Sequence, residues 1–417
     1  MADFTERPAA PVELRTLTAD EQQGWYDTLL RAFGAPEPPE MRALRNELTE
    51  TDRGLGLWDG AECVGTAGAF SFRLSVPGGE LVPAAGVSMV SVAATHRRRG
   101  LLTRLMRRQL DDVRAAGEPL AVLTASEPAI YGRFGYGIAT WHLSAEIDPR
   151  LTRPEVPPET EAVRVRYADP RAVTAACEAV YARLVPGRPG MPARQPGWER
   201  LPLLDPESDR DGGSALQCVL AERDGETVGY ARFHVVPGWE PGGPAGTVRL
   251  RDVEALDPAA YAALWRFLCG IDLTSRITVK TRPVDDALPH LMTDVRRCRL
   301  SVRDGLYARL VEVGAALAAR TYQVPVDVVL EVRDAFCPWN EGRWRLSGDA
   351  AGAVCERTAD PAELALSVRD LGCAYLGGTP LASLAAAGRV REVRAGALAP
   401  VSAAFGSAVA PWLPHGF

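Results

Sequence analysis

The fold of this chain is decided by the segment Val87-Ser88-Met89-Val90-Ser91-Val92-Ala93-Ala94-Thr95-His96-Arg97-Arg98-Arg99-Gly100-Leu101-Leu102-Thr103-Arg104-Leu105-Met106. Its first part, Val87 to Val92, is rich in β-branched and bulky residues that partly alternate with small ones, which predicts a strand. Its last part, from Leu101 onward, repeats apolar residues at helical spacing, which predicts a helix. A short loop with three arginines and one glycine lies between them. We therefore expect a strand, a tight basic loop and a helix in direct succession.

A junction of this kind can bind an anion. The first N–H groups of a helix have no partner within the helix and carry the positive end of its dipole. Gly100 would let the backbone approach a phosphate, and Arg97, Arg98 and Arg99 could add charge-assisted hydrogen bonds. The alternative is a solvated basic turn, because arginine is common in this chain and Lys280 is its only lysine.

The composition describes an ordinary soluble protein with more than one domain. A chain of 417 residues is too long for one typical core, so we expect two or three domains. The net charge of -6 argues against nonspecific binding to nucleic acid, which requires a basic surface. The first residues lack the basic start and apolar stretch of a signal peptide, and prolines interrupt the apolar end too often for a membrane span. We therefore expect a cytoplasmic protein.

The cysteines argue against a metal site. Eight of them are scattered along the chain, without a Cys-x-x-Cys pair or an accompanying cluster of histidines. Most stand in apolar stretches and are expected to be small core residues in a reducing compartment. We therefore expect no metal cofactor.

Three units are expected along the chain, at residues 1–150, 151–300 and 301–417. Several prolines, beginning with Pro149, mark the first boundary. The second unit repeats an Asp-Gly hairpin of the first and follows it with a strand and a helix. Its strand-to-helix loop, Ala255 to Pro258, lacks the Arg-x-x-Gly pattern. We therefore expect a duplicated fold that has lost its phosphate loop and has a structural role.

The third unit is predicted to be a small mixed domain. Apolar residues from Leu306 to Leu317 predict a helix, and a sheet is expected from 328–332, 343–346 and 352–356. Asp360 predicts the start of a further helix. Such a domain could enclose a lipid-sized cavity or only present a surface to a partner.

Two stretches carry a resemblance to a known family. Arg97-x-x-Gly100-x-Leu102 resembles the pyrophosphate-binding motif of the GNAT acetyltransferases, with leucine where the general pattern has a small residue. The second stretch is longer and more distinctive: Ala125-Ser126-Glu127-x-x-Ile130-Tyr131-Gly132-Arg133-Phe134-Gly135-Tyr136-Gly137. With the three-unit order and the apolar ending, the whole chain resembles the Eis (enhanced intracellular survival) family of actinobacterial N-acetyltransferases. The resemblance implies an α/β (α+β) fold of two tandem GNAT domains and a C-terminal domain similar to sterol carrier protein 2.

The resemblance also implies the residues of the site. Tyr131 would be the general acid, and the C-terminal carboxylate of Phe417 the general base. Members of the family assemble as homohexamers and acetylate amines, aminoglycosides among them. Acetyl-CoA would be bound by Val90, Ser91, Val92, Arg98, Arg99, Gly100, Leu101, Leu102, Thr103, Ser126 and Glu127.

Part of this chemistry follows from the residues themselves. A phenol with a pKa of about 10 is protonated at neutral pH and can donate to a leaving thiolate. Tyr131 could do so, although it could also be a packing aromatic, and Tyr136 is its competitor. The apolar end of the chain favours burial, which would raise the pKa of the Phe417 carboxylate above about 3.5 and make it a better base. His415 is an alternative base, and the tail could instead simply pack on its own domain.

The acceptor is the least constrained part of the prediction. The segment Phe33-Gly34-Ala35-Pro36 lacks an acidic residue that could hold a polycation, and Thr124 stands where aminoglycoside-acetylating relatives carry a histidine. Glu37 and Glu40 could compensate only after a loop shift. Acetylation of aminoglycosides or other polyamines is therefore one hypothesis. The alternatives are acetylation of a protein lysine or a small metabolite amine, or a non-catalytic lipid-binding scaffold.

Overall fold

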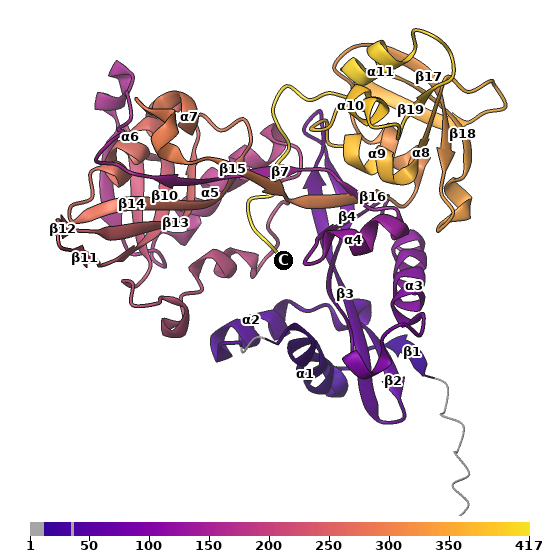
Figure 1. Ribbon diagram of the computed structural model, residues 1–417, viewed down its shortest axis with the longest axis horizontal. Coiled ribbons are helices and arrows are strands. Elements are labelled where there is room, and N and C mark those ends of the chain that lie inside the picture. Colours follow the sequence, from indigo (N-terminus) through magenta and orange to yellow (C-terminus); the bar gives the residue numbers. More distant parts are fainter. Residues whose placement is uncertain (1–11, 35–36) are drawn as a thin grey trace, which may run out of the picture.

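The computed structural model describes residues 12–34 and 37–417, which form three sheets of five or seven strands and a small two-stranded ribbon (Figure 1). The first sheet has the order β1-β2-β3-β4-β5-β16-β6. Its strands are β1 (Glu13–Thr16), β2 (Leu55–Asp59), β3 (Glu62–Ser75), β4 (Leu81–Val92), β5 (Leu120–Thr124), β16 (Leu306–Leu310) and β6 (Gly137–Ile138). Its helices are α1 (Gln22–Phe33), α2 (Pro39–Leu48), α3 (Leu101–Ala115) and α4 (Pro128–Tyr131). The predicted strand, basic loop and helix of the opening segment are confirmed as β4 and α3.

The second sheet has the order β15-β7-β14-β13-β10-β9-β8. Its strands are β15 (Ser301–Asp304), β7 (Trp141–Ile147), β14 (Thr274–Pro283), β13 (Gly246–Ala255), β10 (Glu226–Val236), β9 (Gln217–Arg223) and β8 (Arg164–Ala168). Helices α5 (Thr174–Leu184), α6 (Pro258–Cys269) and α7 (Leu288–Leu291) belong to this part, as does the ribbon of β11 (Trp239–Glu240) and β12 (Gly243–Pro244). The predicted Asp-Gly hairpin is confirmed, because Asp224 and Gly225 join β9 to β10 with positive φ angles of 52° and 81°.

A second pair of antiparallel segments, which we call the shared ribbon, runs through both large sheets. Residues 137–144 lie antiparallel to residues 301–308, and the pairs at 137–138 with 307–308 keep the same register as the pairs at 141–144 with 301–304. Between the sheets, Gly305 N donates to Thr140 O at 3.0 Å and Leu306 N to Thr140 Oγ1 at 2.7 Å. As a result β7 lies in the second sheet although it precedes residue 150, and β16 lies in the first sheet although it follows residue 300.

The helix predicted from Leu306 to Leu317 is wrong in its first half. Leu306–Leu310 is strand β16, inserted between β5 and β6, and every residue of it is buried. The helix α8 begins only at Val313. A strand buried on both faces lacks the polar and apolar alternation of a half-exposed strand, so the apolar residues of β16 also fit a four-residue spacing. The sequence pattern alone could not separate the two structures.

The C-terminal domain is built on the sheet β19-β18-β17-β20-β21. The strands are β17 (Val326–Arg333), β18 (Gly342–Asp349), β19 (Gly352–Arg357), β20 (Leu364–Ser367) and β21 (Arg391–Glu392), and the helices are α8 (Val313–Ala318), α9 (Val368–Ala374), α10 (Leu381–Ala386) and α11 (Leu398–Ala404). The helix start predicted at Asp360 is wrong, because the next element is strand β20. The helix start lies at Ser367, which forms a capping box with Asp370.

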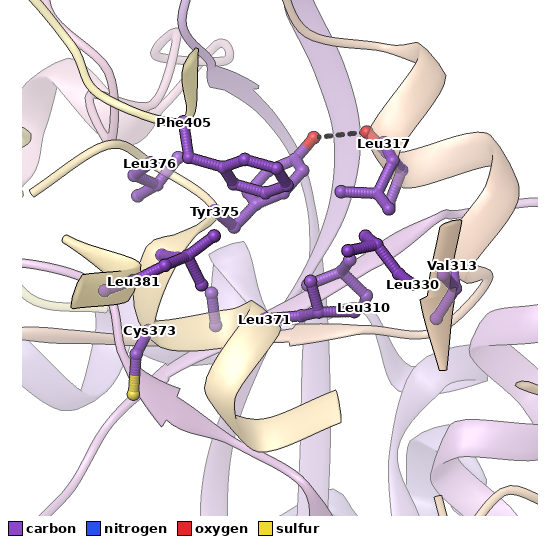
Figure 2. Packing of buried hydrophobic residues seen from close by; sticks show 14 of the residues in the cluster. Leu310, Val313, Leu317, Leu330, Leu371, Cys373, Tyr375, Leu376, Leu381 and Phe405 are labelled. Carbon is purple, nitrogen blue, oxygen red and sulfur yellow. Dashed lines mark hydrogen bonds between the residues drawn. The ribbon is translucent and has the colours of Figure 1, made fainter. Parts of the chain in front are cut away.

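Side chains fill the interior of this domain. Leu317, Leu330, Leu371 and Tyr375 have no exposed surface, and Figure 2 shows these side chains packed together between the helices and the sheet. The core also includes Leu310 of β16, so the C-terminal domain and the first sheet share one hydrophobic cluster. None of the helices in residues 12–34 and 37–417 has the length and apolarity needed to cross a bilayer.

A buried ion pair joins β16 to the C-terminal domain. Arg309 Nη2 donates to Asp334 Oδ1 at 3.0 Å and to Oδ2 at 2.7 Å, and both side chains are excluded from solvent. Asp334 also accepts hydrogen bonds from Cys337 N and Asn340 Nδ2, each at 3.0 Å. Asn340 in turn accepts from Val313 N at 3.0 Å. The network therefore connects the first sheet to the start of α8.

We expect Asp334→Ala to destabilise the protein by about 3–5 kcal/mol, because it leaves the Arg309 guanidinium charged, buried and unpaired. Urea unfolding followed by tryptophan fluorescence measures the loss. Asp327→Ala is the matched control, since Asp327 pairs with Arg345 on the surface of the same domain, where an ion pair contributes less than about 1 kcal/mol. Equal losses in the two variants would contradict the structural role of the buried pair.

Candidate active site

Strand β4 separates from its neighbour β5 where the opening segment begins. The two strands pair in parallel only at 84–86 with 120–122. On its other edge, β4 carries a bulge opposite β3, between the pairs Gly68↔Ser88 and Thr66↔Ser91, and Met89 in this bulge has a φ of 55°. A bulge bends its strand and ends regular pairing. The backbone of 87–92 therefore lies beside a gap between two strands of one sheet.

The basic loop follows directly and has the conformation that an anion site requires. Arg98 and Gly100 both have positive φ angles, 64° and 75°. Among the residues that the structure describes, no side chain caps the first turn of α3, so its backbone N–H groups are free to bind a ligand. Arg97, Arg98 and Arg99 are exposed beside this turn. His96 serves the loop structurally, since its ring bonds to Asp59 Oδ2 at 3.0 Å.

The other residues predicted to contact acetyl-CoA lie around this junction. The Ser91 hydroxyl is buried and bonds to Thr66 at 2.7 Å, and the Leu101 side chain is in the core, so only their backbone is accessible. Leu102 and Val92 are half-buried, whereas Thr103 is exposed on α3. Val90 and Ser126 line a cavity beside β4, and exposed Glu127 precedes α4.

This cavity has a volume of about 750 Å³ and brings the two predicted catalytic residues together. Tyr131 and Phe417 both line it, although 286 residues of chain separate them. Ser88 Oγ, on β4, donates to the Phe417 terminal oxygen at 3.0 Å. The Phe417 ring packs edge-on against Phe72, which packs in the same way against Trp198. Figure 1 shows the C-terminus between the first two sheets.

The tail reaches this position along the second domain. Ala410 N donates to Asp285 Oδ2 at 2.7 Å, and Trp412 N donates to Pro189 O at 2.9 Å. The indole N–H of Trp412 also bonds to Thr281 Oγ1 at 3.1 Å. The tail therefore does not pack only on its own domain, which was the alternative from the sequence.

The two tyrosines considered as general acid from the sequence, Tyr131 and Tyr136, differ in accessibility. Tyr131 is half-buried at the end of α4, and burial raises the pKa of its hydroxyl, with a further rise from the charge of Glu127. Tyr136 is fully buried and packs edge-on against Tyr131, with ring centroids 6.0 Å apart. Of these two residues, Tyr131 lines the cavity and Tyr136 does not.

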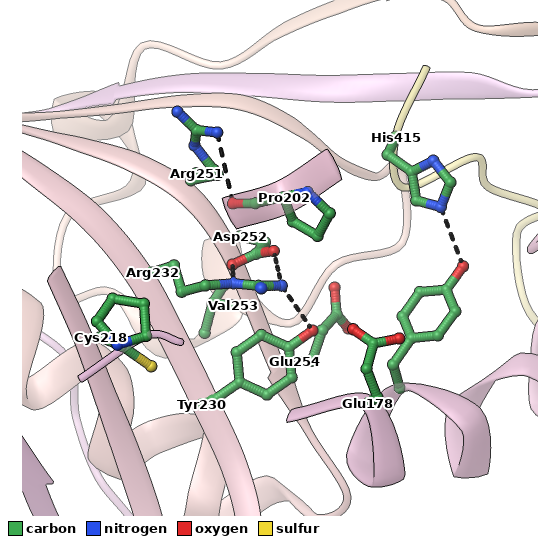
Figure 3. A network of polar contacts seen from close by, with 12 residues as sticks. Glu178, Pro202, Cys218, Tyr230, Arg232, Arg251, Asp252, Val253, Glu254 and His415 are labelled. Atoms are coloured by element: carbon green, nitrogen blue, oxygen red, sulfur yellow. Dashed lines mark hydrogen bonds and ion pairs between the residues drawn. The ribbon is translucent and has the colours of Figure 1, made fainter. Parts of the chain in front are cut away.

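A polar wall from the second domain closes the cavity, and the sequence reasoning missed it. Figure 3 shows its members on β10 and β13, with His415 of the tail facing them. Arg232 pairs with Asp252, and Arg194 pairs with Glu178. Burial, together with the charge of Arg194, lowers the pKa of His415 to about 4, so its ring is neutral at neutral pH. The charged residues in 249–254 were a signal that the second domain contributes more than structure.

Within residues 12–34 and 37–417, no three His, Cys, Asp or Glu side chains gather as the ligands of a metal ion would.

Comparison with known proteins agrees with this architecture. Two acetyltransferase (GNAT) domain models match residues 13–139 and 190–310, and a sterol carrier protein domain model matches 313–414. The predicted order of two GNAT domains and a sterol-carrier-like domain is confirmed.

Relatives match the chain from end to end. An uncharacterized N-acetyltransferase of Streptomyces avermitilis is 69% identical over 97% of this chain and 99% of its own length. The N-acetyltransferase Eis of Mycobacterium tuberculosis is 36% identical over 95% of this chain and 98% of its own. The crystal structure of Eis1 from Mycobacterium abscessus superimposes with a TM-score of 0.83 at 34% identity, covering 98% of this chain and all of that one. The chain therefore belongs to the Eis-like GNAT family and is an N-acetyltransferase.

Proposed function

We propose that the protein transfers the acetyl group of acetyl-CoA to a primary amine bound in the cavity, with Tyr131 as general acid and the Phe417 carboxylate as general base. The observation that carries the proposal is that these two groups, distant in sequence, line the same cavity next to β4.

The residues at the β4–α3 junction fit acetyl-CoA. The gap beside β4 leaves the backbone of Val90, Ser91 and Val92 available to an extended ligand. The uncapped turn at 100–103 and the exposed side chains of Arg98 and Arg99 suit its pyrophosphate. Ser126 and Glu127 would face the bound acetyl-CoA from the end of β5. When bound, acetyl-CoA supplies the thioester from which the acetyl group is transferred.

Residues of the chain would accept and donate the protons that the reaction transfers. The Phe417 carboxylate accepts the proton that the amine nitrogen loses as its lone pair forms the amide C–N bond. Tyr131 Oη donates its proton to the sulfur as the thioester C–S bond breaks. An amine that enters as an ammonium ion releases one further proton to solvent. His415 is a weak competitor for the role of base, since a pKa of about 4 leaves its ring little affinity for a proton.

Three classes of acceptor are considered. Aminoglycosides and related polyamines are the first, as expected from the resemblance. A small metabolite amine is the second class. The ion pairs of the cavity favour it over a polyamine, because the carboxylates that line the cavity already have arginine partners. Protein lysine is a third option that an open cleft would suit.

We also propose that the protein is a homohexamer in the cytoplasm, which the family resemblance supports. Light scattering after size-exclusion chromatography tests the assembly, and cell fractionation tests the location.

The phosphate loop can be tested with two matched glycines. Gly100 and Gly117 flank α3 with φ angles of 75° and 74°, and neither has an atom within 4 Å of an added Cβ. Valine at either position is strained to a similar extent. We expect Gly100→Val to raise KM for acetyl-CoA about tenfold, a change of about 1.4 kcal/mol in binding. Gly117→Val should leave that KM unchanged, and equal effects would argue against the loop as the phosphate site.

The terminal base can be tested by moving the carboxylate. One glycine added after Phe417 displaces the carboxylate from Ser88, so we expect kcat to fall about 100-fold while acetyl-CoA affinity is retained. Phe417→Leu keeps the carboxylate and serves as the control, with a much smaller loss. Release of coenzyme A thiol gives the rates, and calorimetry gives the affinity. Full activity of the extended chain would exclude the terminal carboxylate as the base.

Tyr131→Phe removes only the hydroxyl that would protonate the sulfur, and we expect kcat to fall about 100-fold. Tyr136→Phe is the control, because Tyr136 is fully buried beneath Tyr131 and cannot reach a ligand. Steady-state rates with saturating acetyl-CoA make the comparison. An unchanged kcat in Tyr131→Phe would assign the acid to another group.

A further inference from the structure

The charges that line the cavity limit the kinds of amine it can bind. Asp252 pairs with Arg232, with Nε and Oδ1 2.9 Å apart. Glu254 accepts from Arg282 Nη1 at 3.1 Å. Glu37 pairs with Arg45 at 2.8 Å. Each cavity carboxylate on a side chain is thus already neutralised by an arginine. A substrate with several ammonium groups would lose its hydration without gaining free carboxylates in return.

Arg251 is the exception among the arginines of the cavity. Its Nη1 donates to the carbonyl oxygens of Leu204 at 2.7 Å and Pro202 at 3.4 Å, and its Nη2 donates to His234 Nε2 at 3.3 Å. Within residues 12–34 and 37–417 it forms no ion pair with an Asp or Glu. A guanidinium has five N–H donors, so two are left for a ligand. Arg194 differs, because it pairs with Glu178 and stacks on Tyr181.

A break in strand register places Arg251 in the cavity. In the β10–β13 ladder, Arg232 pairs with Asp252 but the next residue, Phe233, pairs with Leu250, so Arg251 is the extra residue of a bulge. In a regular strand, Arg251 and Asp252 would point to opposite faces. The bulge brings both to the cavity wall, and Figure 3 shows Arg251 beside Pro202 above the Arg232–Asp252 pair.

Hydrogen bonds hold the Arg251 guanidinium in one orientation. His234 Nδ1 lies 3.0 Å from the carbonyl oxygen of Ser214, which can only accept, so Nδ1 carries the proton. The other nitrogen, Nε2, is then an acceptor for Arg251. A guanidinium fixed in this way loses little side-chain freedom when it binds an anion.

One further part of the cavity wall is apolar. Phe70 and Trp198 pack edge-on with ring centroids 4.9 Å apart. Leu29, Met41 and Leu201 line the same region. These side chains suit an apolar group of the size of a ring, and they offer few hydrogen-bond partners to a polar group.

We propose that the acceptor is a primary monoamine with an apolar, ring-sized body and a carboxylate at the end remote from the amine, which pairs with Arg251. The proposal rests on the proposed function, because the amine has to reach Phe417 and Tyr131. It specifies the substrate class by charge: one ammonium, one carboxylate and an apolar body between them.

Three amines test the class on the unmodified protein: phenylethylamine, its para-carboxylate derivative and spermine. Release of coenzyme A thiol gives kcat/KM for each. We expect the carboxylated amine to exceed phenylethylamine by about tenfold, as one charged hydrogen-bonded pair provides, and spermine to be the poorest acceptor.

The variant Arg251→Gln then tests whether Arg251 binds the carboxylate of the acceptor. We expect it to lower kcat/KM for the carboxylated amine about tenfold, chiefly through KM, and to change the value for phenylethylamine less than about twofold. Arg251→Lys should retain part of the preference, because it keeps the charge. Arg249→Gln is the matched control, since Arg249 lies on the same strand and pairs with Asp211 outside the cavity. It should change neither value.

Two results would overturn the proposal while leaving acetyl transfer intact: spermine as the best acceptor, or an equal loss with both aromatic amines in Arg251→Gln. Thiol release that never exceeds the amine-free rate with any of the three amines would count against both this proposal and the proposed function. A preference for the carboxylated amine that Arg251→Gln abolishes would support both.

Discussion

The position of the last residue is the constraint on which the whole site depends. A chain end has more conformational freedom than any other part of a protein, so a terminal carboxylate occupies one place only if its neighbours hold it. Here the tail is held at Ala410 by Asp285, at Trp412 by Pro189, and at its end by Ser88. The tail leaves the C-terminal domain, follows the second and ends on the first. The cavity is therefore complete only when all three domains are in place.

The ribbon shared by the two large sheets makes such placement possible. Because 137–144 and 301–308 stay in one register across both sheets, their backbone hydrogen bonds link the domains as well as shape each one. The buried pair of Arg309 and Asp334 extends this connection to the C-terminal domain. Groups carried by different domains can act on one ligand only if the distance between them is maintained.

Local sequence patterns predicted the parts of the molecule that depend on local structure. The strand, loop and helix around Gly100 follow from residue spacing, and the apolar residues before Phe417 predicted a buried tail. The strand at Leu306–Leu310 was mistaken for a helix because a fully buried strand has no polar face to reveal its period. The position of Arg251 in the cavity wall was missed because it depends on the register of β10 against β13, which is set by pairing between distant segments.

The shared ribbon also has a consequence for the order in which the chain becomes structured during synthesis. Its two strands are separated by more than 150 residues, so the ribosome has made the first strand long before its partner emerges. Until then β5 lacks a neighbour on one edge, and an unpaired edge can associate with other chains. The N-terminal domain cannot mature as an independent unit ahead of the rest, and the nascent protein has to protect that edge while residues 125–305 are synthesised.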